Sequence, residues 1–237
     1  MTSKLEKFFT SFSKEDLFYF MVALYASTII FNEFSKFFLW FLGIIFLIFY
    51  SKVYIYKSKV IWAFIIPVVL HVLFFWNNES FTESIKQLEK FTVFLVFPLI
   101  LVFQSRSINI RKMLSYYSLI FSTILFLFFL YYLSVNFIDF KGYVLGKDVW
   151  KMGYTFSNFL GTHAPRFNMH VSFLSFVNLF LVMNTTLGKS KNFSLFIRVL
   201  CLASSLFVML IINTRLAIAV FFIGAASYVA CIFLQTG

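Results

Sequence analysis

Charged residues are scarce in this chain, and their scarcity excludes a soluble fold. Only 12% of the 237 residues are charged, 61% are hydrophobic and the mean hydropathy is +0.90. A soluble domain carries roughly 25% charged residues. No shift in composition and no Gly/Pro/Ser-rich linker divides the chain. The sequence therefore predicts an all-α, polytopic membrane protein with one transmembrane domain over residues 1–237.

The residue types that build metal centres and nucleotide sites are sparse as well. Cys201 and Cys231 lie within apolar runs without metal-ligand spacing, and a proline separates His163 from His170. The sequence has no phosphate-binding glycine-rich loop, GxSxG elbow, HExxH motif or DxD-type acidic site. We therefore expect no metal and no other cofactor. A transferase of this composition would use a donor already activated in the lipid phase.

Apolar runs recur along the chain at lengths that suit a bilayer, since about 20 apolar residues span the hydrocarbon. They predict about eight transmembrane helices, of which the first, second and fourth are short. The predicted limits are Leu17–Phe31, Phe37–Tyr50, Val60–Trp76, Phe91–Gln104, Met113–Val135, Val171–Leu187, Ser194–Ile212 and Leu216–Leu234.

The distribution of basic residues predicts the orientation of these spans. With the N-terminus inside, the inner segments hold twelve of the twenty basic residues and three of the nine acidic ones. This bias is the one that the positive-inside rule produces, so both termini are predicted to be cytoplasmic. Because the cations are spread over short loops, the net charge of +11 indicates no nucleic-acid partner. Residues 1–16 are predicted to form a basic amphipathic segment that suits membrane lipids as partners.

Two of the predicted outer segments are distinctive. Residues 77–90 predict an interfacial helix, because Ser80-x-x-Glu83 matches a capping box and apolar residues follow at helical spacing. Residues 136–170, between spans five and six, form the longest connection and are rich in aromatic side chains. Loops of this length are more often functional than idle. We expect a periplasmic loop folded onto the membrane surface.

Arg215 is the single charge between Val199 and Leu234, in the turn Asn213-Thr214-Arg215. A guanidinium in hydrocarbon costs roughly 2.5–3.5 kcal/mol at the helix centre, and less near the interface. It either reaches lipid headgroup phosphates or binds a substrate phosphate. We favour the substrate, because the positive-inside rule works against a basic residue on this side. The arginine fork can donate two parallel hydrogen bonds to a phosphate.

A second polar cluster lies at the mouth of the sixth predicted span. An ordinary loop-to-helix junction would also explain it, with Pro165 before the helix and Asn168 as its cap. The cluster consists of His163, Arg166, Asn168 and His170.

Two further polar residues adjoin or lie within predicted spans. Lys90, beside Glu89, is either a substrate contact or half of an interfacial ion pair. His71 lies within the third predicted span, where a lone histidine is more often hydrogen-bonded between helices than catalytic.

Three segments together resemble the O-antigen ligase and O-antigen polymerase family of the bacterial inner membrane. The run QLEK at 87–90 followed by FTVFLVFPLI is similar to an "LEK…L…FPL" segment of ligase-like proteins. HAPRFNMHVSF at 163–173 resembles the family's junction between the outer loop and the next span. IINTRLAIA at 211–219 resembles the "SRxxxLA" turn that opens the family's core region.

The resemblance implies transfer or polymerisation of a glycan without a metal on the periplasmic face. The donor would be an undecaprenyl-diphosphate-linked glycan, and the acceptor a growing glycan or the lipid A core. Arg215 matches the arginine of the "SR" turn, with Thr214 in place of the serine, and Arg166 matches an upstream outer-loop arginine. These two would stabilise the leaving diphosphate. His163, His170, Asn168 and Lys90 would contact substrate.

The resemblance covers only the first part of the family's length. The later part of the family carries a large periplasmic loop with a histidine thought to be catalytic, which neither His163 nor His170 matches. We therefore expect the N-terminal portion of such a protein, either an inactive fragment or a chain that depends on a second polypeptide. A transporter or flippase for anionic lipid-linked sugars is the main alternative, and a scaffold is a third. The predicted spans hold no acid, which counts against proton- or sodium-coupled transport.

Overall fold

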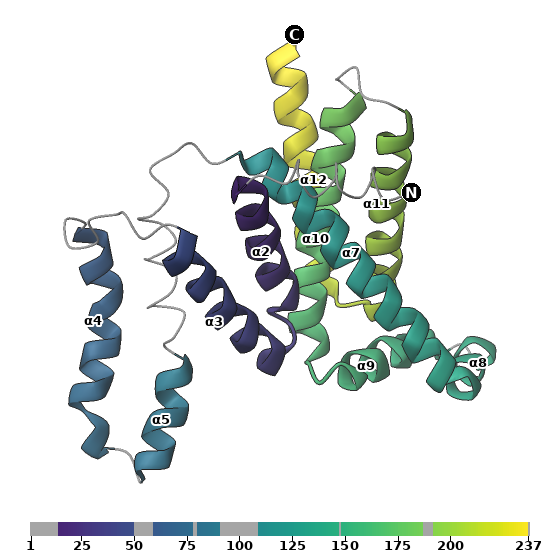
Figure 1. Cartoon of the computed structure of the whole chain (residues 1–237). Coiled ribbons are helices and arrows are strands. Elements are labelled where there is room, and N and C mark those ends of the chain that lie inside the picture. Colours follow the sequence, from purple (N-terminus) through teal and green to yellow (C-terminus); the bar gives the residue numbers. More distant parts are fainter. Residues whose placement is uncertain are drawn as a thin grey trace, which may run out of the picture. The chain divides into compact units, whose positions relative to one another are not determined.

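The computed structural model describes residues 14–49, 59–77, 80–90, 109–146, 148–186 and 192–236, and all regular structure in these ranges is helical (Figure 1). The chain divides into two compact units, which are described separately. The first consists of Met1–Leu17 and Lys36–Asn109, and the second of Phe18–Ser35 and Ile110–Gly237.

The second unit holds most of the described helices. Four of them, α7, α10, α11 and α12, are long and apolar enough to cross a membrane, so the chain is a helical membrane protein. The remaining helices are shorter. The bounds are α2 (Lys14–Thr28, from Phe18 onward in this unit), α7 (Ile110–Val135), α8 (Phe137–Leu145), α9 (Val149–Phe159), α10 (Ala164–Thr186), α11 (Asn192–Ile212) and α12 (Arg215–Thr236).

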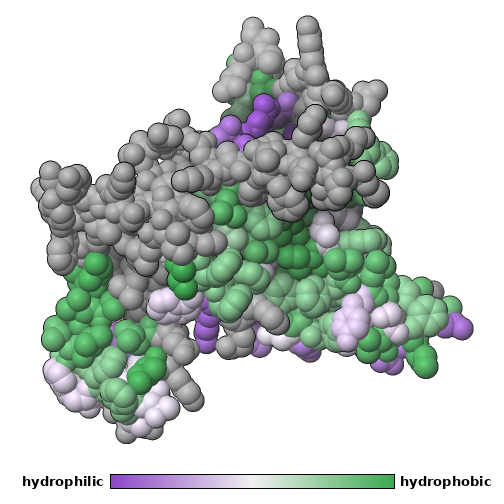
Figure 2. All heavy atoms as spheres, in the orientation of Figure 1, coloured by the Kyte–Doolittle hydropathy of each residue, from purple (hydrophilic) through white to green (hydrophobic). Residues whose placement is uncertain are grey.

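Helix α10 is the centre of this unit, because it packs against α7, α9, α11 and α12. Its apolar face is fully buried and meets Phe121 of α7 and Phe156 of α9 in one hydrophobic core. The outer surface is apolar too, as Figure 2 shows for the described residues in that view. Large hydrophobic side chains such as Phe126 and Ile223 are exposed. A soluble protein rarely exposes so much apolar surface, whereas lipid covers it.

A buried polar network ties three of these helices together. Nδ2 of Asn178 in α10 donates to Ser205 Oγ and to the Cys201 carbonyl of α11, each at 3.0 Å. Its Oδ1 accepts from Ser118 Oγ of α7, and Ser122 Oγ lies 3.4 Å from Nδ2. Hydrocarbon offers no alternative partner for polar groups, so such bonds fix how α7, α10 and α11 face one another.

The first unit contains most of α3 (Asn32–Phe49), together with α4 (Lys59–Leu73), the 3-10 turn η2 (Phe75–Asn77) and α5 (Phe81–Lys90). The N–H of Glu83 donates to Ser80 Oγ at 3.2 Å, so Ser80 caps α5 as predicted. His71 Nε2 lies 3.2 Å from the carbonyl of Ser84. This contact joins α4 to α5 and agrees with the hydrogen-bonded role weighed for His71, whereas its position within a membrane span stays a prediction.

Four of the eight predicted spans, the fifth to the eighth, coincide with α7, α10, α11 and α12 in that order. Three others overlap the shorter helices α2, α3 and α4, and their crossing of the membrane stays a prediction. The fourth, Phe91–Gln104, lies outside the described residues, as do residues 1–13. Both the sidedness and the periplasmic position of 136–170 stay predictions.

The interval 136–170 is not an extended loop. It contains α8 and α9, and its last residues already belong to α10. The predicted start of the sixth span at Val171 is too late, since α10 begins at Ala164. Pro165 is compatible with this earlier start because a proline in the first helical turn lacks only an N–H that would have no partner there.

Candidate functional site

The start of α10 and the turn between α11 and α12 meet at one end of the second unit, called here the Arg215 end. Asn168 Nδ2 donates to Thr214 Oγ1 at 2.6 Å, and Ser172 Oγ donates to the Ala217 carbonyl at 2.9 Å. Asn168 and Ser172 are four residues apart and share a face of α10. Two adjacent turns of α10 therefore hold the beginning of α12.

The backbone between α11 and α12 reverses over two residues. Asn213 has a positive φ of 50° and its N–H donates to the Met209 carbonyl at 3.1 Å, which closes α11. Asparagine is one of the few residues that adopt this left-handed conformation at modest cost. Arg215, predicted to lie in the turn, is instead the first residue of α12.

The position of Arg215 is unfavourable unless it meets an anion. Its side chain is exposed, and within the described ranges it makes no hydrogen bond or ion pair. A helix N-terminus carries a partial positive charge, so a cation there costs about 0.3–1 kcal/mol. The same N-terminus has unpaired backbone N–H groups, which together with a guanidinium suit a phosphate.

Arg166 lies in the first turn of α10 and is exposed. Its Nη2 donates to the carbonyl of Ile29 at 3.4 Å, just beyond the end of α2. The C-terminal end of a helix carries partial negative charge, so this contact is favourable. A guanidinium has five N–H donors, and one bond leaves donors for a further acceptor.

Helical spacing separates the predicted cluster onto two faces of α10. Arg166 and His170 are four residues apart in α10 and share a face of it, and His163 is the residue directly before the helix. His163 is exposed and His170 is half-buried. Asn168 is turned away from them and is fully buried against Thr214. The alternative role of Asn168 as the helix cap does not hold, because its side chain bonds the neighbouring turn.

Two buried polar atoms near this end have no hydrogen-bond partner among the described residues: Asn168 Oδ1 and Thr162 Oγ1. A buried polar atom without a partner costs about 1–3 kcal/mol. Sequence reasoning did not single out Thr162 or the bond from Asn168 to Thr214. A threonine two residues before the helix start was the available signal, and its burial depends on packing.

Helix α9 packs against the last residues of α11 and against α10 near the Arg215 end. Gly153 of α9 lies so close to α11 that an added Cβ would be 2.5 Å from the Ile211 carbonyl oxygen. Phe156, one turn later, packs its ring against Phe167 of α10 with centroids 5.6 Å apart. The close approach of α9 therefore constrains the position of the last residues of α11 and of the turn before Arg215.

Lys90 belongs to the first unit, as the last residue of α5, and the position of its side chain is outside the described part. Its proposed substrate contact stays a prediction. Across the described ranges, no group of three or more His, Cys, Asp and Glu side chains is arranged to hold a metal ion.

No family model, curated protein or solved structure matches this chain. Any functional assignment must come from the residues and contacts of the chain itself.

Proposed function

We propose that this chain binds the diphosphate of a lipid-linked glycan at the Arg215 end and acts in transfer or polymerisation of that glycan in the bacterial inner membrane. The supporting observation is the hydrogen bond from Asn168 to Thr214, which joins the N-terminal turns of α10 and α12. Each of these turns carries an exposed arginine, Arg166 and Arg215.

The charge arrangement favours an anionic ligand. Two guanidiniums and two positive helix ends are held at one end of an apolar bundle, and the side chains of this chain do not neutralise Arg215 within the described ranges. A diphosphate offers several acceptor oxygens to two arginine forks. When the glycosidic bond to the diphosphate breaks, the leaving group gains charge that these cations stabilise.

The neighbouring side chains suit the sugar part of such a substrate. His170 lies on the Arg166 face of α10, His163 directly precedes the helix, and both can hydrogen-bond hydroxyl groups. The hydrogen bond from Asn168 to Thr214 links the start of α10 to the start of α12, so in this proposal Asn168 positions Arg215. An acceptor glycan or lipid A core would approach the same end.

Transport of an anionic lipid-linked sugar is the second candidate. The observation that favours it is the buried polar network around Asn178, which places hydroxyl and amide groups in the middle of the spans. Polar groups inside a bundle can line a path for a headgroup. A ligase reaction releases free lipid diphosphate, whereas a transporter moves the intact lipid-linked sugar, so product analysis separates the two.

The test is a turnover assay on the purified chain in nanodiscs, with lipid-diphosphate glycan and acceptor. We expect Arg215→Ala to lower the release of lipid diphosphate by about 100-fold or more, the loss typical of one preorganised donor. Arg215→Lys should recover only part of the rate, because a lysine lacks the fork. Lys141→Ala removes an exposed charge from α8 and serves as the control.

Unchanged turnover in Arg215→Ala would refute the role of Arg215. If the parent chain shows no turnover, binding of the lipid diphosphate is measured instead, and equal affinity for parent and Arg215→Ala refutes the site. Sidedness is checked with His163→Cys in a background without Cys201 and Cys231. An impermeant thiol reagent must label it from the extracytoplasmic side.

A further inference from the structure

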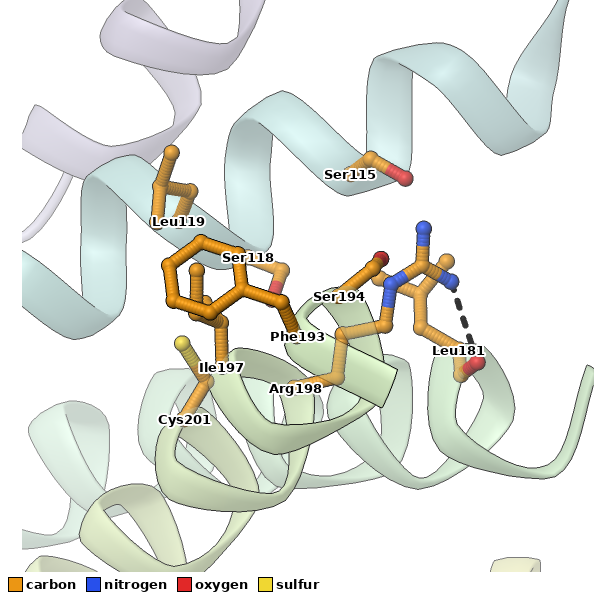
Figure 3. Close-up of a pocket in the computed structure, with 9 residues that line it drawn as sticks. All are labelled: Ser115, Ser118, Leu119, Leu181, Phe193, Ser194, Ile197, Arg198 and Cys201. Carbon is orange, nitrogen blue, oxygen red and sulfur yellow. Dashed lines mark hydrogen bonds between the residues drawn. The ribbon is translucent and has the colours of Figure 1, made fainter. Parts of the chain in front are cut away.

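A pocket of about 230 Å³ lies at the opposite end of the second unit, called here the Arg198 end, between α7 and α11 and beside the last turns of α10 (Figure 3). None of the residues at the Arg215 end contributes to it. It is therefore independent of the proposed function.

Among the described residues that line this pocket, Arg198 is the charged one. It lies within the candidate span Phe193–Ile212 and is half-buried. Its Nη1 donates to the Leu181 carbonyl at 3.1 Å, near the end of α10. Placing an arginine in a membrane span costs about 2.5–3.5 kcal/mol at the centre, and such residues usually face a polar group or an interface.

A second arginine is anchored at the same end. Nη2 of Arg111, in the first turn of α7, donates to the Asn184 carbonyl at 3.1 Å. The two arginines thus bond carbonyls in the last turns of α10, where the helix carries partial negative charge. Arg111 is exposed and does not line the pocket. It therefore provides a matched control for Arg198.

The pocket wall is divided into a polar and an apolar part. Figure 3 shows Arg198, Ser194 and Ser115 grouped on one side of the pocket, and Phe193, Leu119 and Ile197 on the other. Serine hydroxyls and a guanidinium are donors that suit a phosphate. The apolar side suits methylene groups, which would leave water for a favourable contact.

We propose that the pocket at the Arg198 end binds an anionic phospholipid, with the phosphate on Arg198, Ser194 and Ser115 and the first part of an acyl chain on the apolar side. The volume is below the roughly 300–1,000 Å³ of pockets that enclose a whole small molecule, which fits a site for part of a lipid. A free phosphate would use the donors and leave the apolar wall uncovered, so the lipid is the better match.

Native mass spectrometry of the delipidated, purified chain tests this proposal with phosphatidylglycerol and phosphatidylcholine as probes. We expect one tightly held phosphatidylglycerol and weaker retention of phosphatidylcholine. Arg198→Gln should weaken phosphatidylglycerol binding about tenfold, the effect of losing one charge-assisted hydrogen bond. Arg111→Gln removes the same charge at the same end and should change it less than about twofold.

Two further measurements keep the outcome decisive. Ser194→Phe fills the pocket without changing the charge and should also weaken lipid binding, with folding checked by gel filtration and SDS unfolding. Equal losses in Arg198→Gln and Arg111→Gln would overturn the proposal in favour of general charge attraction. Displacement of the lipid by excess inorganic phosphate would overturn it in favour of a free-phosphate site.

Discussion

The contact between Gly153 of α9 and the end of α11 offers the sharpest test of the structure. A Cβ added at Gly153 would lie 2.5 Å from the Ile211 carbonyl oxygen and from the Cα of Ile212, and 2.9 Å from the Ile212 carbonyl oxygen. All three atoms belong to the backbone, so no side chain can rotate away. Gly153→Ala therefore forces α9 and α11 apart.

The expected loss follows from two opposing effects. Ordinary Cβ contacts begin near 3.4 Å, so the helices must separate by the better part of an ångström. Overpacking of this kind costs typically about 1–3 kcal/mol. Replacing glycine by alanine within a helix returns about 0.5–1 kcal/mol. We expect Gly153→Ala to lower the free energy of unfolding by about 1–2 kcal/mol.

Equilibrium unfolding with SDS in mixed micelles, followed by tryptophan fluorescence, measures this free energy. Gly142→Ala is the matched control, because Gly142 lies in α8 and an added Cβ there meets nothing within 4 Å. It should raise stability by about 0.5–1 kcal/mol. The two glycines carry the same substitution in neighbouring helices, and only the contact with α11 distinguishes them.

If Gly153→Ala is as stable as Gly142→Ala, the close approach of α9 to α11 is refuted. Helix α9 would then no longer constrain the turn before Arg215. A destabilised Gly153→Ala should also bind the lipid diphosphate more weakly than Gly142→Ala, because the displaced end of α11 carries that turn.

Two further pairs of substitutions test the network and the turn, using the same unfolding assay. Asn178→Ala should lower stability by about 1–2 kcal/mol, since it removes bonds to α7 and α11 within the spans. Ser204→Ala, which loses only a bond to the Cys201 carbonyl of its own helix, should have a smaller effect, and equal losses would contradict a network between helices. Asn213→Val should cost about 1–2 kcal/mol because Asn213 has φ 50°, whereas Asn213→Gly should be nearly neutral; a neutral valine would refute this turn.

Helix type and the four long spans followed directly from apolar run length, because a helix of that length pairs its own backbone N–H and C=O groups while it crosses lipid. The predicted helix limits were least accurate where a helix begins with polar residues. Ala164–His170 read as the end of a loop, but tertiary packing of Phe167 and Val171 against the core draws that stretch into α10. Arg215 was likewise predicted to lie in the turn, but it is the first residue of α12.

The residues of the candidate site could be predicted from the sequence, but their arrangement in space could not. A lone arginine between two apolar runs is visible in the chain because its insertion cost is a local property. Helical spacing separates Asn168 from Arg166, but which of the two faces is buried depends on how α10 is rotated about its axis. That rotation is set by the bonds to Thr214 and Ala217, residues remote in sequence.

The sequence by itself determined that this protein is a bundle of membrane helices with basic residues between its apolar runs, since hydropathy and length are read residue by residue. Only the tertiary structure decided which helix starts meet at the Arg215 end and that Arg198 lines a pocket at the other. Both depend on which faces of the helices contact one another. Apolar side chains permit many such pairings, and a few buried polar bonds and one close glycine contact select among them.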